Sequence, residues 1–218
     1  MREGSLGQIG LKRLVVGMLG TNCYLIFDKT TKEGYVIDAG SEAKKIISSV
    51  RECQMNCLGV LCTHGHMDHV GAAGKVAQEV SVPVYISRED SPILTGASSG
   101  ISLKIGSLLV SKPSGIEFLE DGQEVFFGDN RIEVLSTPGH TRGSISFLVD
   151  DMLFCGDLIF EGSIGRTDLK GGSFDDLLAS VKSKVFTLPD ETRIFPGHGP
   201  PTTVGREKRS NPFLMRLR

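Results

Sequence analysis

The fold is decided by one stretch of the sequence, Thr63-His64-Gly65-His66-Met67-Asp68-His69-Val70-Gly71. It begins where Cys57 to Cys62, an apolar run typical of a buried strand, ends, and it runs into a helix expected from about Val70 to Glu79. In a looped backbone, residues two positions apart point to the same side, so His64 and His66 face one point. Imidazoles and a carboxylate clustered at a strand end are costly unless a cation offsets them. The segment therefore predicts a metal site.

Two further histidines and one aspartate stand in matching settings. Pro138-Gly139-His140 follows a predicted strand, Pro196-Gly197-His198 follows another, and Asp157 comes directly after an apolar run. Each segment alone is typical of a turn. Together with the first stretch they contain all 5 histidines of the chain, which favours one shared site.

The rest of the pattern is that of a mixed α/β protein, with helices outside a sheet. Helices are expected through Ile46, Ile47 and Val50 with Ser41 as the cap, over Val70 to Glu79, and over Phe174 to Val185. Gly205 to Arg218 is a basic end, and Ser91 to Gly115 fits no period and predicts a mobile loop or lid. Strands are predicted at Leu11 to Val16, Cys23 to Phe27, Tyr35 to Ile37, Cys57 to Cys62, Val82 to Ile86, Ile116 to Leu119, Glu124 to Phe127, Ile132 to Leu135, Ser144 to Val149, Met152 to Cys155 and Arg193 to Phe195.

Composition narrows the classes of protein to consider. With 218 residues and no linker pattern, the chain is expected to form a single domain over residues 1–218. A hydrophobic content of 39%, a charged content of 23% and a net charge of -2 argue against a disordered, membrane-spanning or nucleic-acid-coating protein. A small-molecule partner is expected, and the oligomeric state is left open. The 5 cysteines suit reduced thiols, and Met1 to Gly20 lacks the apolar core of a secretory signal, so we predict a cytoplasmic location.

The His64-x-His66-x-Asp68-His69 run, followed in order by His140, Asp157 and His198, resembles the ligand motifs of the metallo-β-lactamase superfamily. The resemblance implies a four-layer αββα sandwich with mixed sheets and helices on the outer faces. It also implies two divalent metal ions. His64, His66 and His140 would hold the first, Asp68, His69 and His198 the second, and Asp157 would bridge them. Imidazole and carboxylate ligands suit zinc, the ion we expect, as well as iron or manganese.

Two ions about 3.5 to 4 Å apart share a water and lower its pKa towards 7, which predicts a bridging hydroxide as nucleophile. Asp68 would orient this hydroxide and take up its proton as the catalytic residue. Asp38 ends another strand. By resemblance it positions the histidine loop, and on the sequence alone it reads equally well as a turn carboxylate.

A finer resemblance links the chain to the short glyoxalase II-like members of the superfamily. It is carried by Gly156 to Phe160, Gly162 to Asp168, Pro196 to Thr203 and Asn211-Pro212-Phe213. The implied activity is hydrolysis of thioesters of the S-lactoylglutathione type. Arg166 would then meet a substrate carboxylate, or it would form a structural ion pair with Asp168.

The sequence also suggests three other interpretations. The run Gly165-Arg166-Thr167-Asp168 also resembles persulfide dioxygenases, which would use one iron held by His64, His140 and Asp157. A structural zinc module is disfavoured because such sites prefer cysteine ligands. A serine hydrolase is suggested by the letters of Gly96-Ala97-Ser98-Ser99-Gly100, but no strand leads into this segment and no helix follows it.

Overall fold

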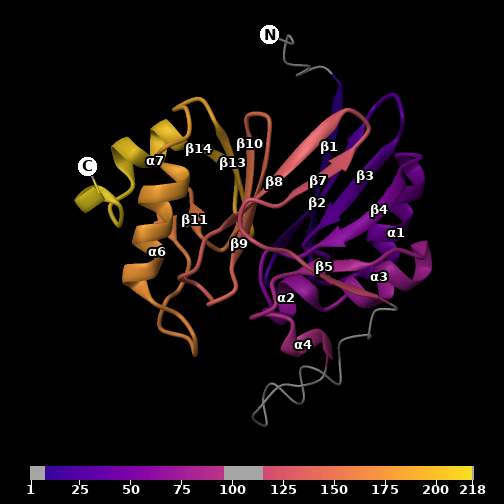
Figure 1. The fold of residues 1–218 in the computed structure, drawn as a ribbon, viewed down its shortest axis with the longest axis horizontal. Coiled ribbons are helices and arrows are strands. Elements are labelled where there is room, and N and C mark those ends of the chain that lie inside the picture. The colour runs from indigo at the N-terminus through magenta and orange to yellow at the C-terminus, as the bar shows by residue number, and fades with distance from the viewer. Residues whose placement is uncertain (1–7, 96–114, 218) are drawn as a thin grey trace.

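The protein is built on two mixed β-sheets that pack face to face. The structure is a computed structural model, and it describes residues 8–95 and 115–217. Figure 1 shows the first half of the chain, in indigo and magenta, beside the second half, in orange and yellow. Helices cover the outer face of each half (Figure 1). The predicted four-layer αββα sandwich is therefore confirmed, whereas a single domain over residues 1–218 stays a prediction.

The first sheet combines an antiparallel meander with parallel strands. Its strands, which lie side by side in sequence order, are β1 (Ile9–Val16), β2 (Thr21–Asp28), β3 (Glu33–Ile37), β4 (Asn56–Leu61), β5 (Val84–Ile86) and β6 (Ile116–Phe118). Strands β1 to β3 are antiparallel, and β3 to β6 are parallel. Parallel neighbours need crossover connections. Helix α1 (Ala43–Glu52) supplies the first, and α2 (Met67–Val70) with α3 (Ala73–Val80) supplies the second.

The second sheet follows a similar plan. Its strands are β7 (Glu124–Phe127), β8 (Asn130–Ser136), β9 (Ile145–Val149), β10 (Met152–Gly156), β13 (Arg193–Pro196) and β14 (Thr202–Thr203), in the order β14-β13-β10-β9-β8-β7. Only β10 and β13 pair in parallel. The connection between them carries the short hairpin β11 (Ile159–Phe160) and β12 (Ser163–Ile164), helix α6 (Phe174–Ser180) and a π-helical segment (Val181–Val185). Helix α7 (Val204–Ser210) and a 3₁₀ turn (Met215–Leu217) follow β14.

Three apolar clusters fill the spaces between the four layers, because strand side chains alternate between the two faces of a sheet. On β2, Cys23 and Leu25 face the helices of the first half, whereas Tyr24 and Ile26 face the second sheet. On β10 the same alternation sends Phe154 into the space between the sheets and the neighbouring side chains towards α6. Within the described parts of the chain, no helix is long and apolar enough to cross a membrane.

Tertiary hydrogen bonds move two helix boundaries away from those predicted. Ser41 does not cap α1, so that prediction is wrong. The helix starts after Glu42, whose carboxylate accepts a hydrogen bond from the Gly17 backbone N–H at 3.0 Å. The helix predicted over Val70 to Glu79 is divided into α2 and α3. The Ala72 N–H bonds to the Ala39 carbonyl at 2.9 Å instead of continuing the helix.

The predicted loop from Ser91 to Gly115 contains a short helix at its start, α4 (Pro92–Thr95). Proline suits the first turn of a helix because its missing N–H would have no partner there. Leu94, 1% exposed, anchors this turn in the core of the first half. Residues 96–114, including the Gly96 to Gly100 segment, lie outside the described part of the chain.

Backbone hydrogen bonds join the two sheets at one edge. The Ile145 N–H donates to the Thr63 carbonyl at 2.8 Å, and the Asn22 N–H donates to the Gly197 carbonyl at 2.7 Å. These bonds hold the segment after β4 against the start of β9, and the start of β2 against the segment after β13. The ends of strands from both sheets therefore meet at this edge.

Candidate metal centre

The seven predicted ligands meet at the edge where the sheets are joined. They follow strands β4, β8, β10 and β13, or lie on α2 at the end of the first loop. Their ligand atoms form three groups in which all atoms lie within 4.8 Å of one another. The groups are His64 with His66 and His140, Asp68 with His69 and His198, and His64 with His69 and Asp157.

Two of these groups are the two triads that the resemblance implies for the two ions. Asp157 lies between them. Its Oδ1 is 3.3 Å from His69 Nε2, and its Oδ2 is 3.6 Å from His140 Nε2 and 3.7 Å from His198 Nε2. One carboxylate thus approaches members of both triads, as a bridging ligand must.

The buried atoms of this centre fit a cation. Among the described residues, the buried side-chain atoms that lack a hydrogen-bond partner are His64 Nε2, His69 Nε2 and Asp157 Oδ1. Buried polar atoms are nearly always paired, so orphans need an explanation. All three belong to the same group of ligand atoms. Two ions, one beside His64 and one beside His69, with Asp157 between them, would satisfy all three atoms.

Hydrogen bonds orient four of the five histidines. The Nδ1 atoms of these rings lie near oxygen acceptors and are therefore assigned the proton, which leaves the Nε2 lone pair for a metal. The acceptors are Thr63 Oγ1 for His64 at 3.1 Å, Asp38 Oδ2 for His69 at 2.9 Å, the Arg166 carbonyl for His140 at 2.7 Å, and the Leu19 carbonyl for His198 at 3.2 Å. His66 instead presents Nδ1, which lies 2.8 Å from His140 Nε2.

The electrostatics of the centre also favour a bound cation. Burial, reinforced by the other histidines, holds the pKa of His64 well below its usual value, so this ring stays neutral. Burial alone would raise the pKa of Asp157, but His69 outweighs burial and lowers it. For Asp68 burial is likewise outweighed, by the contact with His198 and the nearby His69, and the pKa falls. These two ionised carboxylates act in return on their neighbours: Asp68 raises the pKa of His198, and, against the opposing effect of burial, Asp38 together with Asp157 raises the pKa of His69.

Both Pro-Gly-His segments need their glycine. Gly139 has φ +143, a backbone conformation that residues with a side chain rarely adopt, and its Cα faces the backbone of Leu177. At Gly197 an added Cβ would lie 2.6 Å from His69 Cε1 and would also strike the Asp157 carboxylate. Each glycine therefore lets the backbone before a histidine approach its neighbours closely.

The chain matches a known protein family over most of its length. The sequence profile of the metallo-beta-lactamase superfamily matches residues 16–198. The chain belongs to this superfamily. Its relatives include the hydroxyacylglutathione hydrolase GloC of Haemophilus influenzae, 38% identical over 201 residues, with 88% of this chain and 92% of GloC covered.

Two solved superfamily structures are also similar over nearly the whole chain. TTHA1623, solved in a di-iron-bound form, is 37% identical with a TM-score of 0.78, and the match covers 93% of this chain and 100% of that one. ETHE1 from Myxococcus xanthus is 30% identical with a TM-score of 0.76, and the match covers 95% and 89%. The resemblance inferred from the sequence is confirmed, and divalent metal chemistry is expected in this superfamily.

In this superfamily member, Asp38 joins two parts of the histidine loop. Its Oδ1 accepts a hydrogen bond from the Thr63 N–H at 2.8 Å, and its Oδ2 accepts from the Thr63 hydroxyl at 2.8 Å and from His69 Nδ1 at 2.9 Å. It is 1% exposed and has φ 54. Of the two interpretations left open by the sequence, the contacts favour positioning of the histidine loop.

We expect Asp38→Asn to weaken binding of the ion beside His69 about 10- to 100-fold, because outer partners orient metal ligands. Asn tolerates a left-handed backbone, but its amide nitrogen cannot accept a hydrogen bond. Zinc titration of the metal-free protein measures the effect. The matched control is Asp150→Asn, since Asp150 has φ 50 in an exposed turn. Equal affinities in both variants would contradict the role of Asp38.

Cys155, beside the bridging position in sequence, lies in the core next to α6. Burial raises its pKa to about 12, and it is not a member of any ligand group.

Two residues that the sequence did not predict contact the candidate ligands. Thr21 donates from its hydroxyl to Asp68 Oδ2 at 3.2 Å, and the Leu19 carbonyl faces His198. Both come from the β1–β2 hairpin, far from the motif in sequence, and no local pattern marked them. Thr63 directly precedes the motif and was within reach of sequence reasoning.

Proposed function

We propose that this protein is a dinuclear metal-dependent hydrolase that cleaves thioesters of the S-lactoylglutathione type. The observation that carries the proposal is the pair of ligand triads with Asp157 between them. When bound, two divalent ions would supply a water of lowered pKa and would polarise the substrate carbonyl. His64, His66 and His140 would hold one ion and Asp68, His69 and His198 the other. The similarity to GloC supports the thioester substrate.

Asp68 is the side chain that links the centre to a substrate groove. Of the seven candidate ligands, it alone lines a groove of about 690 Å³, a size suited to a small-molecule ligand. Its Oδ2 accepts from the Thr21 hydroxyl and lies 3.2 Å from His198 Nε2, which fixes the carboxylate. We propose that this carboxylate takes up the proton released when water attacks the carbonyl.

The groove has an apolar wall and one cation. Met18 and Leu19, at the β1–β2 turn, line the groove and are 104% and 70% exposed, and Lys75 in α3 also lines it. These features suit an acyl group carried on an acidic thiol. We propose a small-molecule substrate and neither a nucleic-acid nor a membrane partner, and the cytoplasmic location stays a prediction.

The direct test combines metal analysis with an S-lactoylglutathione assay on the wild type and on His66→Ala. We expect two ions per chain in the wild type. His66→Ala removes a ligand of the first triad, so it should lose one ion and lower turnover about 100-fold, since a metal contributes several kcal/mol to the transition state. Unchanged metal content and unchanged turnover in His66→Ala would refute the dinuclear assignment.

A second candidate function is suggested by the similarity to ETHE1 and by the grouping of His64 with Asp157. This function is a persulfide dioxygenase-like reaction, in which His64, His140 and Asp157 would hold one iron and the other candidate ligands would not bind metal. Asp68, His69 and His198 nevertheless form a complete second group, which favours the dinuclear hydrolase. One iron per chain with oxygen uptake on glutathione persulfide would reverse this choice.

Arg166 is a proposed substrate-binding residue whose side chain is already paired. Its guanidinium donates twice to Asp168, at 3.0 and 2.9 Å, and both side chains are more than two-thirds exposed. If Arg166 binds a substrate carboxylate, Arg166→Ala should raise KM about tenfold, the loss of one charge-assisted contact, without changing metal content. The Arg166 carbonyl that orients His140 is untouched by this substitution.

The matched control is Asp168→Asn, which breaks the same ion pair but leaves the guanidinium in place. Its KM should not rise. A similar rise in KM for both variants would show that the ion pair is structural, and no rise in either would remove Arg166 from the substrate site.

A further inference from the structure

A carboxylate outside the seven candidate ligands ties together two loops of the centre. Asp90 Oδ2 accepts a hydrogen bond from the Gly65 N–H at 2.9 Å and from the Thr141 hydroxyl at 2.6 Å. Its Oδ1 accepts from the Gly143 N–H at 3.2 Å. Asp90 lies beyond the end of β5, 25 residues from Gly65 and 51 from Thr141. One side chain thus joins the histidine loop and the turn of His140 to the segment after β5.

The two loops joined by this carboxylate carry His64, His66 and His140, the candidate ligands of the first metal ion. The donor on the first loop lies between His64 and His66, and the donor hydroxyl on the second directly follows His140. We propose that Asp90 is a positioning residue for the first metal ion, holding the loop of His64 and His66 in register with the turn of His140. The inference rests on the proposed dinuclear function.

The packing around Asp90 leaves these loops little freedom to move. A Cβ added at Gly65 would lie 2.6 Å from the Asp90 carbonyl, and one added at Gly143 would lie 2.7 Å from Asp90 Oδ1. Thr141 Oγ1 is also 2.7 Å from Ser144 Oγ, so the hydroxyl that binds Asp90 is itself held. The two glycines therefore let the backbone close onto the carboxylate.

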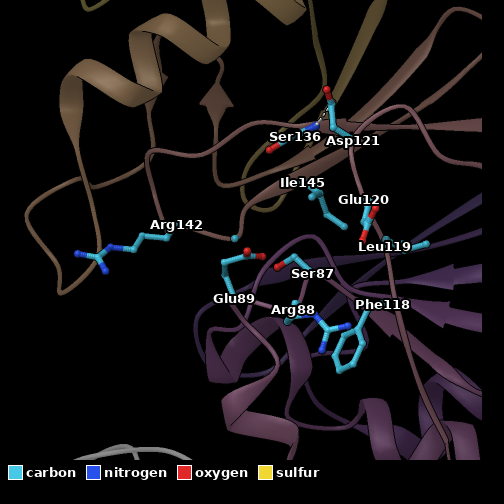
Figure 2. Close-up of a pocket in the computed structure, with 11 residues that line it drawn as sticks. Ser87, Arg88, Glu89, Phe118, Leu119, Glu120, Asp121, Ser136, Arg142 and Ile145 are labelled. Atoms are coloured by element: carbon cyan, nitrogen blue, oxygen red, sulfur yellow. Dashed lines mark hydrogen bonds between the residues drawn. The ribbon is translucent and has the colours of Figure 1, made fainter.

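Beside this contact lies a pocket of about 330 Å³ whose lining includes Ser87, Glu89, Gly143 and Arg142. Figure 2 shows Ser87 and Glu89 on one side and Arg142 on the other, with the chain of the second sheet above them. Ser87 Oγ in turn accepts from the Asp90 N–H at 3.4 Å. Asp90 thus stands where the segment after β5 meets the turn of His140, and its carboxylate accepts hydrogen bonds from this turn and from the histidine loop.

The test titrates zinc into metal-free protein against a competing chelator, for the wild type and Asp90→Asn. Hydrogen bonds to a carboxylate are stronger than neutral ones, and loss of such outer partners typically costs 10- to 100-fold in metal affinity. Asp90→Asn should lower the affinity for one of the two zinc ions by about 10- to 100-fold and leave the affinity for the other unchanged. In a His66→Ala background, which lacks the first triad, Asp90→Asn should have no further effect on the remaining ion.

Asp28→Asn is the matched control. Asp28 also accepts three hydrogen bonds, from the Thr30 and Thr31 N–H groups and from Asn130 Nδ2, but it lies at the end of β2, away from the centre. It should leave both zinc affinities unchanged. Should Asp90→Asn fail to fold, Thr141→Val offers a second test. It removes one hydrogen-bond donor to Asp90 and should lower the affinity for the same zinc ion by a smaller factor.

The outcomes separate this inference from the function on which it rests. A wild type that binds no zinc refutes the dinuclear function, and the role of Asp90 with it. If the wild type binds two ions, two results for Asp90→Asn refute the role of Asp90 alone. One is that both zinc affinities are unchanged. The other is that both affinities fall by the same factor.

Discussion

Asp157→Asn is expected to abolish tight binding of both metal ions and to lower S-lactoylglutathione hydrolysis by about 10³-fold, equivalent to about 4 kcal/mol of transition-state stabilisation. The reason is the position of this carboxylate. Its two oxygens approach His69 in one triad and His140 in the other, and Oδ1 is buried without a hydrogen-bond partner. An amide in its place keeps the shape but removes the charge shared by the two ions.

The matched control for this substitution lies at the opposite end of the same strand. Asp151 directly precedes β10, as Asp157 directly follows it, and it forms two hydrogen bonds with Arg193 at 3.0 and 2.8 Å. Asp151→Asn should retain both ions and full turnover. If Asp157→Asn kept two ions per chain by elemental analysis, Asp157 would not be the bridging ligand.

The second large effect is expected for Asp68→Asn, which should lower kcat for S-lactoylglutathione by about 10³-fold, within the range for loss of a general base. Unlike Asp157→Asn, this variant should retain the ion held by His64, His66 and His140, since Asp68 belongs only to the other group. One ion per chain together with the loss of kcat is therefore the expected pair of results.

Glu42→Gln controls for the removal of negative charge from the same groove. Glu42 lines the groove with Asp68 but pairs with Lys45 and the Gly17 N–H instead of the centre. Its kcat and metal content should match the wild type. A similar fall in kcat for Glu42→Gln would attribute the effect to the charge of the groove and would remove the catalytic role from Asp68.

Sequence reasoning could predict that the candidate ligands lie close together because they obey local rules. His64, His140, Asp157 and His198 each come just after an apolar strand, and strand ends of a layered α/β protein gather at one edge. The strand pattern itself follows from alternation, as on β2, where neighbouring side chains enter different apolar clusters. The family resemblance then assigned the order of the layers.

What the sequence did not predict depends on contacts between distant segments. The Leu19 carbonyl reaches His198 across 179 positions, and Asp90 reaches Thr141 across 51. Neither residue stands in a pattern that marks it. The same cause shifted the helix boundaries, because the partner of Ala72 is the Ala39 carbonyl, which no local periodicity reveals.

The most direct test of the central claim is a crystal structure of the wild-type protein grown with zinc, with anomalous data collected at the zinc edge. We predict two anomalous peaks per chain, one among His64, His66 and His140 and the other among Asp68, His69 and His198, with Asp157 contacting both. A single peak, or peaks away from these side chains, would contradict the dinuclear centre.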